Sequence, residues 1–196
     1  MKISAILLGA GESKRMGRDK LLLPWGKRTI LEHCLQVLLR TKVNEVIVVL
    51  GHRKEEMAHR LIGKRVKVLF NPNPEKGMSS SIQRGLRALD PQSAGILIGL
   101  GDMPSLKSRT IDAILRAFRE EKGNIILPSF RGRQGHPVLF HRKYKGELLK
   151  LKGDTGGKSI IMKHPEDVFV VPIKSEGVIR DIDTWVEYKK ELRVKG

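Results

Sequence analysis

Short apolar segments that alternate with helical patterns place the strongest constraint on the fold of this chain. Six segments have the composition of strands, and several of them are apolar on both faces. A strand with one wet face alternates apolar and polar residues, so these segments suit the buried strands of a mostly parallel sheet. The six lie at residues 3–8, 45–50, 66–70, 95–100, 124–128 and 168–172.

Apolar residues at helical spacing fill the intervals between these strands. They recur at residues 29–40, 54–62, 79–89 and 108–122. The alternation predicts an α/β fold that is doubly wound, with a mostly parallel sheet and helices on both faces. Ligands of such sheets bind beyond the carboxyl ends of the strands, so the residues just after Leu8, Phe70 and Leu100 are the first candidates for a site.

Length and composition indicate one globular domain. A chain of 196 residues can bury a sizeable core and is short for two domains, so we expect a single domain over residues 1–196. Its apolar runs are shorter than a membrane span. The run 3–8 leads directly into Gly9 without a signal-peptide pattern, so we expect a cytoplasmic protein with no membrane partner. One cysteine, Cys34, excludes an intrachain disulfide and a cysteine-based zinc cluster.

The charge balance is strongly basic and favours anionic partners. The formal net charge is +17 at pH 7, and such a surface attracts polyanions. The basic residues are spread along the chain, aromatic residues are 5%, and no nucleic-acid-binding motif is present, which disfavours nucleic acid as the partner. A phosphorylated small molecule would use the same field, and part of the charge also fits a heat-adapted composition.

The segment after the first strand has the composition of a phosphate-binding loop, and we call residues 8–20 the glycine loop. Its glycines let the backbone approach phosphates and offer N–H donors, while Arg15 and Lys20 supply positive charge. The dinucleotide fingerprint would need a glycine at Lys14, and the Walker motif would need Gly-Lys-Ser/Thr where Gly17-Arg18-Asp19 stands. Neither motif matches. An ordinary strand-to-helix turn with solvated cations is the alternative.

Two acidic segments indicate a metal site. Asp102 directly follows an apolar strand, at the edge of the sheet where a ligand would bind, and Asp181 and Asp183 stand two residues apart near the C-terminus. In phosphate chemistry Mg²⁺ is commonly held by one or two carboxylates together with substrate phosphates. A turn aspartate before Pro104 and a helix cap at Asp183 or Thr184 are the competing interpretations.

Two further loops, residues 75–82 and 153–159, combine glycines with hydrogen-bond donors. The first leads into a helix, so its amide and hydroxyl groups would face a base, ribose or phosphate unless its serines only cap the helix. Lys158 would reach a phosphate from the second loop. His136 lies in a tight turn before Pro137, where a structural hydrogen-bonding role is the simplest interpretation. The chain contains no Gly-x-Ser-x-Gly nucleophile elbow.

Taken in order, these segments resemble the molybdenum cofactor nucleotidyltransferases, the MobA-like NTP transferases that attach a nucleotide to molybdopterin. The resemblance covers almost the whole chain. The chain is more similar to the cytidylyltransferase subgroup than to the guanylyltransferase subgroup. Ala10 stands where the guanylyltransferases tend to have glycine, and Asp-Ile-Asp-Thr replaces their asparagine-rich run. The motifs that carry it lie at residues 8–17 with 20–22, 77–81, 101–104, 135–137, 153–156 and 181–184.

The resemblance implies Mg²⁺-dependent transfer of a nucleotidyl group from CTP to molybdopterin on a Rossmann-like fold, giving molybdopterin cytosine dinucleotide and pyrophosphate. It assigns catalysis to Arg15, Lys20 and Asp102, and Mg²⁺ binding to Asp102 and Asp183. It assigns the acceptor or phosphate side to His136 and Lys158. It assigns nucleotide binding to Leu8, Gly9, Ala10, Gly11, Ser13, Arg15, Lys20, Ser79, Ser80, Ser81 and Gly101.

Two departures from the cytidylyltransferase pattern keep other functions open. Gly9 stands where that pattern usually has alanine, and Lys158 replaces an arginine, which exchanges a planar fork for a point charge. The alternatives are a transferase that uses GTP or another NTP with a different phosphorylated acceptor, such as a sugar phosphate, and a non-catalytic nucleotide- or nucleic-acid-binding module. The resemblance also implies a protein partner that delivers the cofactor or a molybdenum enzyme that receives it.

Overall fold

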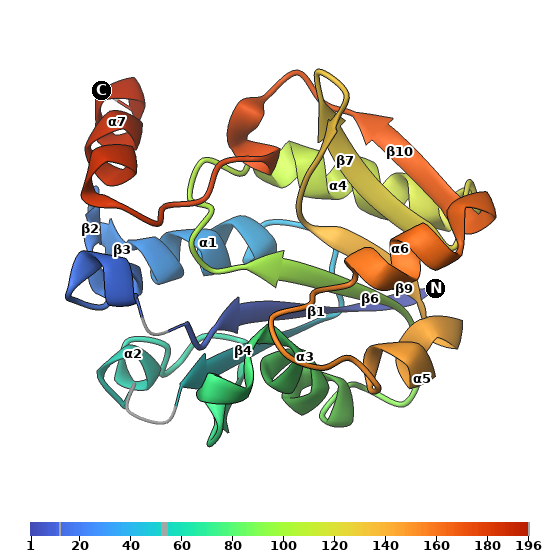
Figure 1. Cartoon of the computed structure of the whole chain (residues 1–196), viewed down its shortest axis with the longest axis horizontal. Coiled ribbons are helices and arrows are strands. Elements are labelled where there is room, and N and C mark those ends of the chain that lie inside the picture. The colour runs from blue at the N-terminus through green and yellow to red at the C-terminus, as the bar shows by residue number, and fades with distance from the viewer. Residues whose placement is uncertain (12, 52–54, 196) are drawn as a thin grey trace.

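The computed structural model describes residues 1–11, 13–51 and 55–195 of the chain, and a mixed β-sheet runs through its middle (Figure 1). In the described residues the sheet has eight strands in the order β10-β7-β9-β6-β1-β4-β5, with β8 paired to β7. The strands are β1 (Lys2–Gly9), β4 (Glu45–Gly51), β5 (Lys67–Asn71), β6 (Ser93–Leu100), β7 (Ile125–Phe130), β8 (Arg133–Gln134), β9 (Val138–His141) and β10 (Val168–Pro172).

Most neighbouring strands are parallel, which confirms the predicted fold class. β1 pairs with β4 and β6 in parallel, as do β4 with β5 and β7 with β10. β9 is antiparallel to both β6 and β7, and it is therefore the strand through which the two parallel parts of the sheet are joined. A separate small hairpin is formed by β2 (Pro24–Trp25) and β3 (Arg28–Thr29).

Helices cover both faces of the sheet, as the sequence predicts. α1 and α4 pack on one face and α3, α5 and α6 on the other (Figure 1). The helices are α1 (Ile30–Leu39), α2 (Glu55–His59), α3 (Met78–Arg87), α4 (Ser108–Arg119), α5 (Lys145–Leu148), α6 (Lys158–Lys163) and α7 (Trp185–Lys195). The expected helix at 54–62 begins at Lys54, which lies outside the described residues. No described helix is long and apolar enough to span a bilayer.

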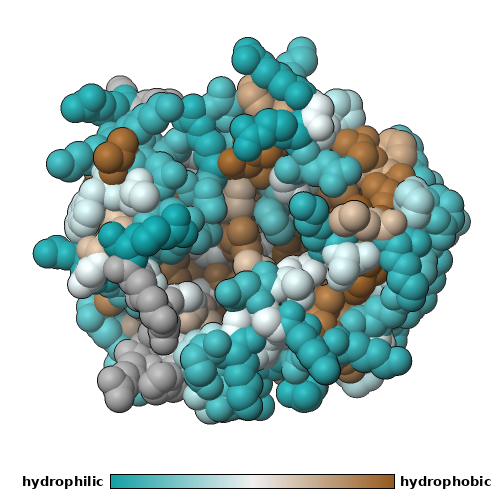
Figure 2. Space-filling view, viewed as in Figure 1, coloured by the Kyte–Doolittle hydropathy of each residue, from teal (hydrophilic) through white to brown (hydrophobic). Residues whose placement is uncertain are grey.

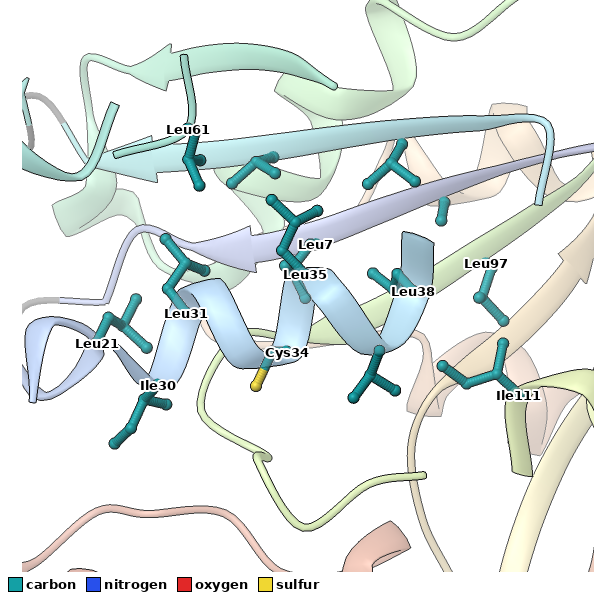
Figure 3. Packing of buried hydrophobic residues seen from close by; sticks show 14 of the residues in the cluster. Leu7, Leu21, Ile30, Leu31, Cys34, Leu35, Leu38, Leu61, Leu97 and Ile111 are labelled. Atoms are coloured by element: carbon teal, nitrogen blue, oxygen red, sulfur yellow. The ribbon is translucent and has the colours of Figure 1, made fainter. Parts of the chain in front are cut away.

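The strands are apolar on both faces because each face meets a different group of helices. Along β1, Leu7 belongs to the core that includes α1 and α4, whereas Ile6 belongs to the core that includes α3. Leu7 lies beside Leu31 and Leu35 of α1 (Figure 3). On the other face α3 approaches β1 closely, since a Cβ at Gly85 would lie 2.7 Å from Ile6 Cγ2. These contacts fix the helices that flank the carboxyl ends of β1 and β6.

Candidate functional site

A cavity of about 440 Å³ opens at the carboxyl ends of β1 and β6. On the face of the molecule that Figure 2 shows, hydrophilic residues dominate, and hydrophobic residues lie in a hollow near the middle. The cavity is where an α/β sheet is expected to bind a ligand. Its lining residues are Leu8, Gly9, Ala10, Gly11, Ser13, Arg15, Lys20, Leu21, Pro74, Glu75, Gly77, Met78, Ser81, Leu100, Asp102, Asp154 and Asp183.

The glycine loop forms one wall of the cavity and folds back on itself. The amide of Lys20 donates to Ser13 Oγ (3.1 Å), and the amide of Met16 donates to the carbonyl of Ser13 (3.0 Å). Ser13 has a φ of 54°, a left-handed conformation that few non-glycine residues adopt. Helix α7 also contacts this loop, because Trp185 Nε1 donates to the carbonyl of Met16 (3.2 Å). Glu12 of this loop lies outside the described residues.

Lys20 is buried between two carboxylates that come from distant parts of the chain. Its Nζ lies 2.6 Å from Asp102 Oδ2 and 2.6 Å from Asp183 Oδ1. Burial alone would lower the pKa of Lys20, but the charges and hydrogen bonds of the two carboxylates outweigh burial and raise it above its usual value. The ammonium thus compensates two carboxylates that would otherwise repel each other.

Arg15 pairs with the second of these carboxylates from the solvent side. Its Nη2 lies 2.5 Å from Asp183 Oδ2, and its side chain is 69% exposed. Burial would raise the pKa of Asp183, but Lys20 and Arg15 together hold this pKa below its usual value. The two cations predicted to bind phosphates are therefore both present at the cavity, and both form ion pairs with carboxylates there.

The helix-cap interpretation of Asp183 does not hold in the structure. Thr184 caps α7 instead: its Oγ1 accepts from the amide of Glu187 (3.2 Å), and Glu187 Oε2 accepts from the amide of Thr184 (2.8 Å). The Asp183 carboxylate is thereby left to face the cavity. Asp181 is not among the lining residues, and burial, with the charges of Asp102 and Asp183, raises its pKa.

The carboxylate oxygens of Asp102 and Asp183 are of the kind that binds a divalent cation. Asp102 Oδ1 is buried and has no hydrogen-bond partner among the described residues, which leaves an acceptor available. The loops of the two aspartates are also joined directly, because the amide of Ile182 donates to the carbonyl of Asp102 (3.0 Å). The described residues contain no group of three or more His, Cys, Asp or Glu side chains that could hold a metal. Two carboxylates would need water or phosphate oxygens to complete the shell, as Mg²⁺ commonly does.

The serines predicted to face the nucleotide have different environments. Ser81 lines the cavity, whereas Ser79 and Ser80 do not. Ser80 Oγ donates within its own loop to the carbonyl of Gly77 (2.8 Å). Asn71, at the end of β5, donates from Nδ2 to Ser80 Oγ (2.7 Å) and to Ser81 Oγ (2.9 Å). The strand that ends near Phe70 thus holds the start of α3 against the cavity.

The opposite wall forms where the two glycine-containing loops meet. Asp154 Oδ1 accepts from the amide of Met78 (3.1 Å), and the carbonyl of Gly153 accepts from the amide of Ser79 (3.1 Å). Asp154 thereby caps α3, whose own N-cap residue, Gly77, has no side chain to do so. A Cβ on Gly77 would overlap the backbone of Gly153, and its φ of 86° is one that favours glycine. Residue spacing alone gave no signal for this capping.

The remaining predicted residues lie outside the cavity lining. Gly101 supports it, because its amide donates to the carbonyl of Leu8 (2.8 Å) and holds the ends of β1 and β6 together. Lys158 is exposed at the first position of α6. His136 has a buried Nδ1 with no hydrogen-bond partner among the described residues. Burial lowers the pKa of His136, and the charge of Asp102 acts in the opposite direction.

Known proteins resemble this chain along most of its length. Residues 5–168 match the family model described as the MobA-like NTP transferase domain. The molybdenum cofactor cytidylyltransferase of Escherichia coli (strain K12) is 29% identical over 183 residues, which are 93% of this chain and 91% of that protein. The nicotine blue oxidoreductase of Paenarthrobacter nicotinovorans is 28% identical over 191 residues, with 93% and 92% covered.

Solved structures have the same fold. The crystal structure of Rv0371c from Mycobacterium tuberculosis H37Rv superposes with a TM-score of 0.89 at 27% identity, covering 98% of each chain. A second structure, described as Rv0371C in complex with manganese, gives a TM-score of 0.83 at 24% identity and covers 98% of this chain and 99% of that one.

Proposed function

Because this chain belongs to the MobA-like NTP transferase family, we propose that it transfers a nucleotidyl group from CTP to molybdopterin and releases pyrophosphate. One observation carries the proposal. The cavity brings the glycine loop together with Lys20, Arg15 and the two carboxylates of Asp102 and Asp183. These are the groups that nucleotidyl transfer needs, namely amide and cationic partners for a triphosphate and oxygen ligands for a metal.

The charges that line the cavity support dependence on a divalent metal. The lining residues include four carboxylates, Glu75, Asp102, Asp154 and Asp183, and the cations Arg15 and Lys20. The excess positive charge of the chain is thus not concentrated where the triphosphate would bind. A triphosphate that entered the cavity without a metal ion would meet more negative than positive side chains. Asp102 and Asp183 would hold Mg²⁺. When bound, Mg²⁺ neutralises charge on the reacting phosphates.

The chemistry needs no proton acceptor from the protein. The terminal phosphate of molybdopterin is already an anion, so one of its oxygens attacks the α-phosphorus of CTP directly. A new P–O bond forms to that phosphorus while its bond to the β-phosphate oxygen breaks, and pyrophosphate leaves in line with the attack. Lys20 and Arg15 would balance the negative charge of the triphosphate through this step, and the glycine loop would hold it in place.

The proposal is most specific in its choice of CTP as the nucleotide and molybdopterin as the acceptor. Ala10 supports CTP through the resemblance of the glycine loop to the cytidylyltransferases, and the similarity to the enzyme of Escherichia coli supports molybdopterin. Another relative of comparable similarity carries the name of an oxidoreductase, so the test must vary both substrates.

The test is pyrophosphate release with each of the four NTPs, combined in turn with molybdopterin and with sugar 1-phosphates. We expect the highest kcat/KM with CTP and molybdopterin, and no release when Mg²⁺ is removed by chelation. Faster release with GTP would show that GTP, not CTP, is the nucleotide substrate, and faster release with a sugar phosphate would show that the acceptor is not molybdopterin. Polynucleotide binding that weakens steeply with salt, without any pyrophosphate release, would show that the protein is a binding module and not a transferase.

A further inference from the structure

Glu191 of α7 is a buried carboxylate that lies away from the cavity lining. Among the described residues, Lys20 and Glu191 are the charged residues that are buried, and Glu191 is 5% exposed. A buried carboxylate is costly unless it is paired and hydrogen-bonded. Both oxygens of Glu191 have such a partner: Oε2 accepts from Ser105 Oγ, and Oε1 accepts from Arg180 Nη1 at 2.8 Å.

The two partners of Glu191 belong to the two loops that carry the candidate metal ligands. Ser105 stands three residues after Asp102, and Arg180 stands three residues before Asp183. One carboxylate on α7 therefore connects both loops. Arg180 also pairs with Glu176 on its own segment, which fixes the guanidinium in the position from which it meets Glu191.

The backbones of these two loops are in direct contact with each other. The amide of Ile182 donates to the carbonyl of Asp102 (3.0 Å), and Gly177 packs so closely that a Cβ there would overlap the carbonyl of Ser105. The separation between the Asp102 and Asp183 side chains thus depends on how the two loops dock. Glu191 is the buried charged group that joins the two loops through their side chains.

We propose that Glu191 is a positioning residue for the metal site, which sets the separation of Asp102 and Asp183 through Ser105 and Arg180. This inference rests on the proposed function, because it assumes that the two aspartates bind a divalent ion. Groups that orient metal ligands from outside the coordination shell typically change metal affinity by 10- to 100-fold when they are altered. Loss of the Glu191 charge is expected to act in the same way.

The variant that tests this is Glu191→Gln, which keeps the shape of the side chain. The amide lacks the negative charge that pairs with Arg180. If its oxygen accepts from Arg180, its NH₂ group faces Ser105 Oγ, which must then accept a hydrogen bond instead of donating one. The readout is the affinity for Mn²⁺, followed by electron paramagnetic resonance of the free ion, with and without CTP. We expect affinity about 10-fold weaker than in the wild type. In turnover, the apparent KM for Mg²⁺ should rise by a similar factor while kcat at saturating Mg²⁺ changes little.

Glu45→Gln is the matched control. Glu45 is also a largely buried carboxylate, and it accepts from Ser4 Oγ (2.6 Å) and pairs with Lys67. It stands at the first residue of β4, at the opposite end of the strands from the cavity. Glu45→Gln should lower thermal stability but leave Mn²⁺ affinity unchanged.

Ser105→Ala removes one arm of the Glu191 clamp and provides a second test if Glu191→Gln does not fold. It should weaken Mn²⁺ binding in the same direction by a smaller factor. Wild-type affinity for Mn²⁺ in a folded Glu191→Gln or Ser105→Ala protein would overturn the positioning role and leave the proposed function standing. Absence of Mn²⁺ binding by the wild type in the presence of CTP would overturn both.

Discussion

Replacement of Lys20 by methionine tests whether this internal cation stabilises the pair of carboxylates that flank it. Lys20→Met keeps the aliphatic length of the side chain and leaves Asp102 and Asp183 facing each other without the ammonium that lies 2.6 Å from both. Removal of one partner from a fully buried ion pair costs about 3–5 kcal/mol. The two carboxylates retain 20% and 26% exposure, so water screens part of this cost, and we expect a loss of about 2 kcal/mol.

The assay is thermal unfolding with and without Mg²⁺. In a chain of this length, 2 kcal/mol corresponds to a Tm lower by about 4–8 °C. Mg²⁺ should raise the Tm of Lys20→Met more than that of the wild type, because the carboxylates are then free to bind it, and ligand at 100 times its Kd contributes about 2.7 kcal/mol. Lys20→Arg keeps the charge and is the control, with a small Tm change and no added response to Mg²⁺. An unchanged Tm in Lys20→Met, or equal Mg²⁺ responses in all three proteins, would refute the reasoning.

Three further outcomes are expected. Asp102→Ala should abolish pyrophosphate release and leave the far-ultraviolet circular dichroism of the wild type; release at near the wild-type rate would remove Asp102 from the mechanism. Gly77→Ala should cost about 1–3 kcal/mol because its φ of 86° disfavours a side chain, and urea unfolding should show a lower midpoint with an unchanged slope; a wild-type midpoint would contradict this. Hydrogen bonds from Lys143 and Tyr144 hold the pKa of Asp167 well below its usual value, so the stability it contributes is present above about pH 4 and is lost as the pH falls further. Asp167→Asn should flatten that part of the urea stability profile between pH 5 and pH 2, and an unchanged profile would argue against the assignment.

The strands and main helices were predictable because their apolar periodicity is local. The segment 3–8 corresponds to β1, and the expected helix 29–40 corresponds to α1, which begins at Ile30 with Thr29 as its N-cap. The reversed direction of β9 was not predictable, since an apolar run has the same pattern whichever way it pairs. The hairpin of β2 and β3 was missed because each strand has two residues, too few to show a period.

The candidate site was predictable as separate parts but not as an arrangement. Residue types and neighbouring glycines mark Lys20, Asp102 and Asp183, yet nothing in the sequence indicates that the lysine lies between the two carboxylates. Capping of α3 by Asp154 and the burial of Glu191 also arise from tertiary contacts across long stretches of chain. Propensity and spacing describe neighbours in sequence, so contacts of this kind lie beyond them.

The position of Lys20 has a consequence for the order in which its ion pairs can form while the chain is being synthesised. The lysine is synthesised early, but the residue that completes its pairing follows 163 positions later. A ribosome delivers the glycine loop, β1 and β6 long before it delivers Asp183, and N-terminal segments begin to fold first. Nascent polypeptides that stop short of Asp183 therefore carry an incompletely paired lysine and lack one of the two proposed metal ligands.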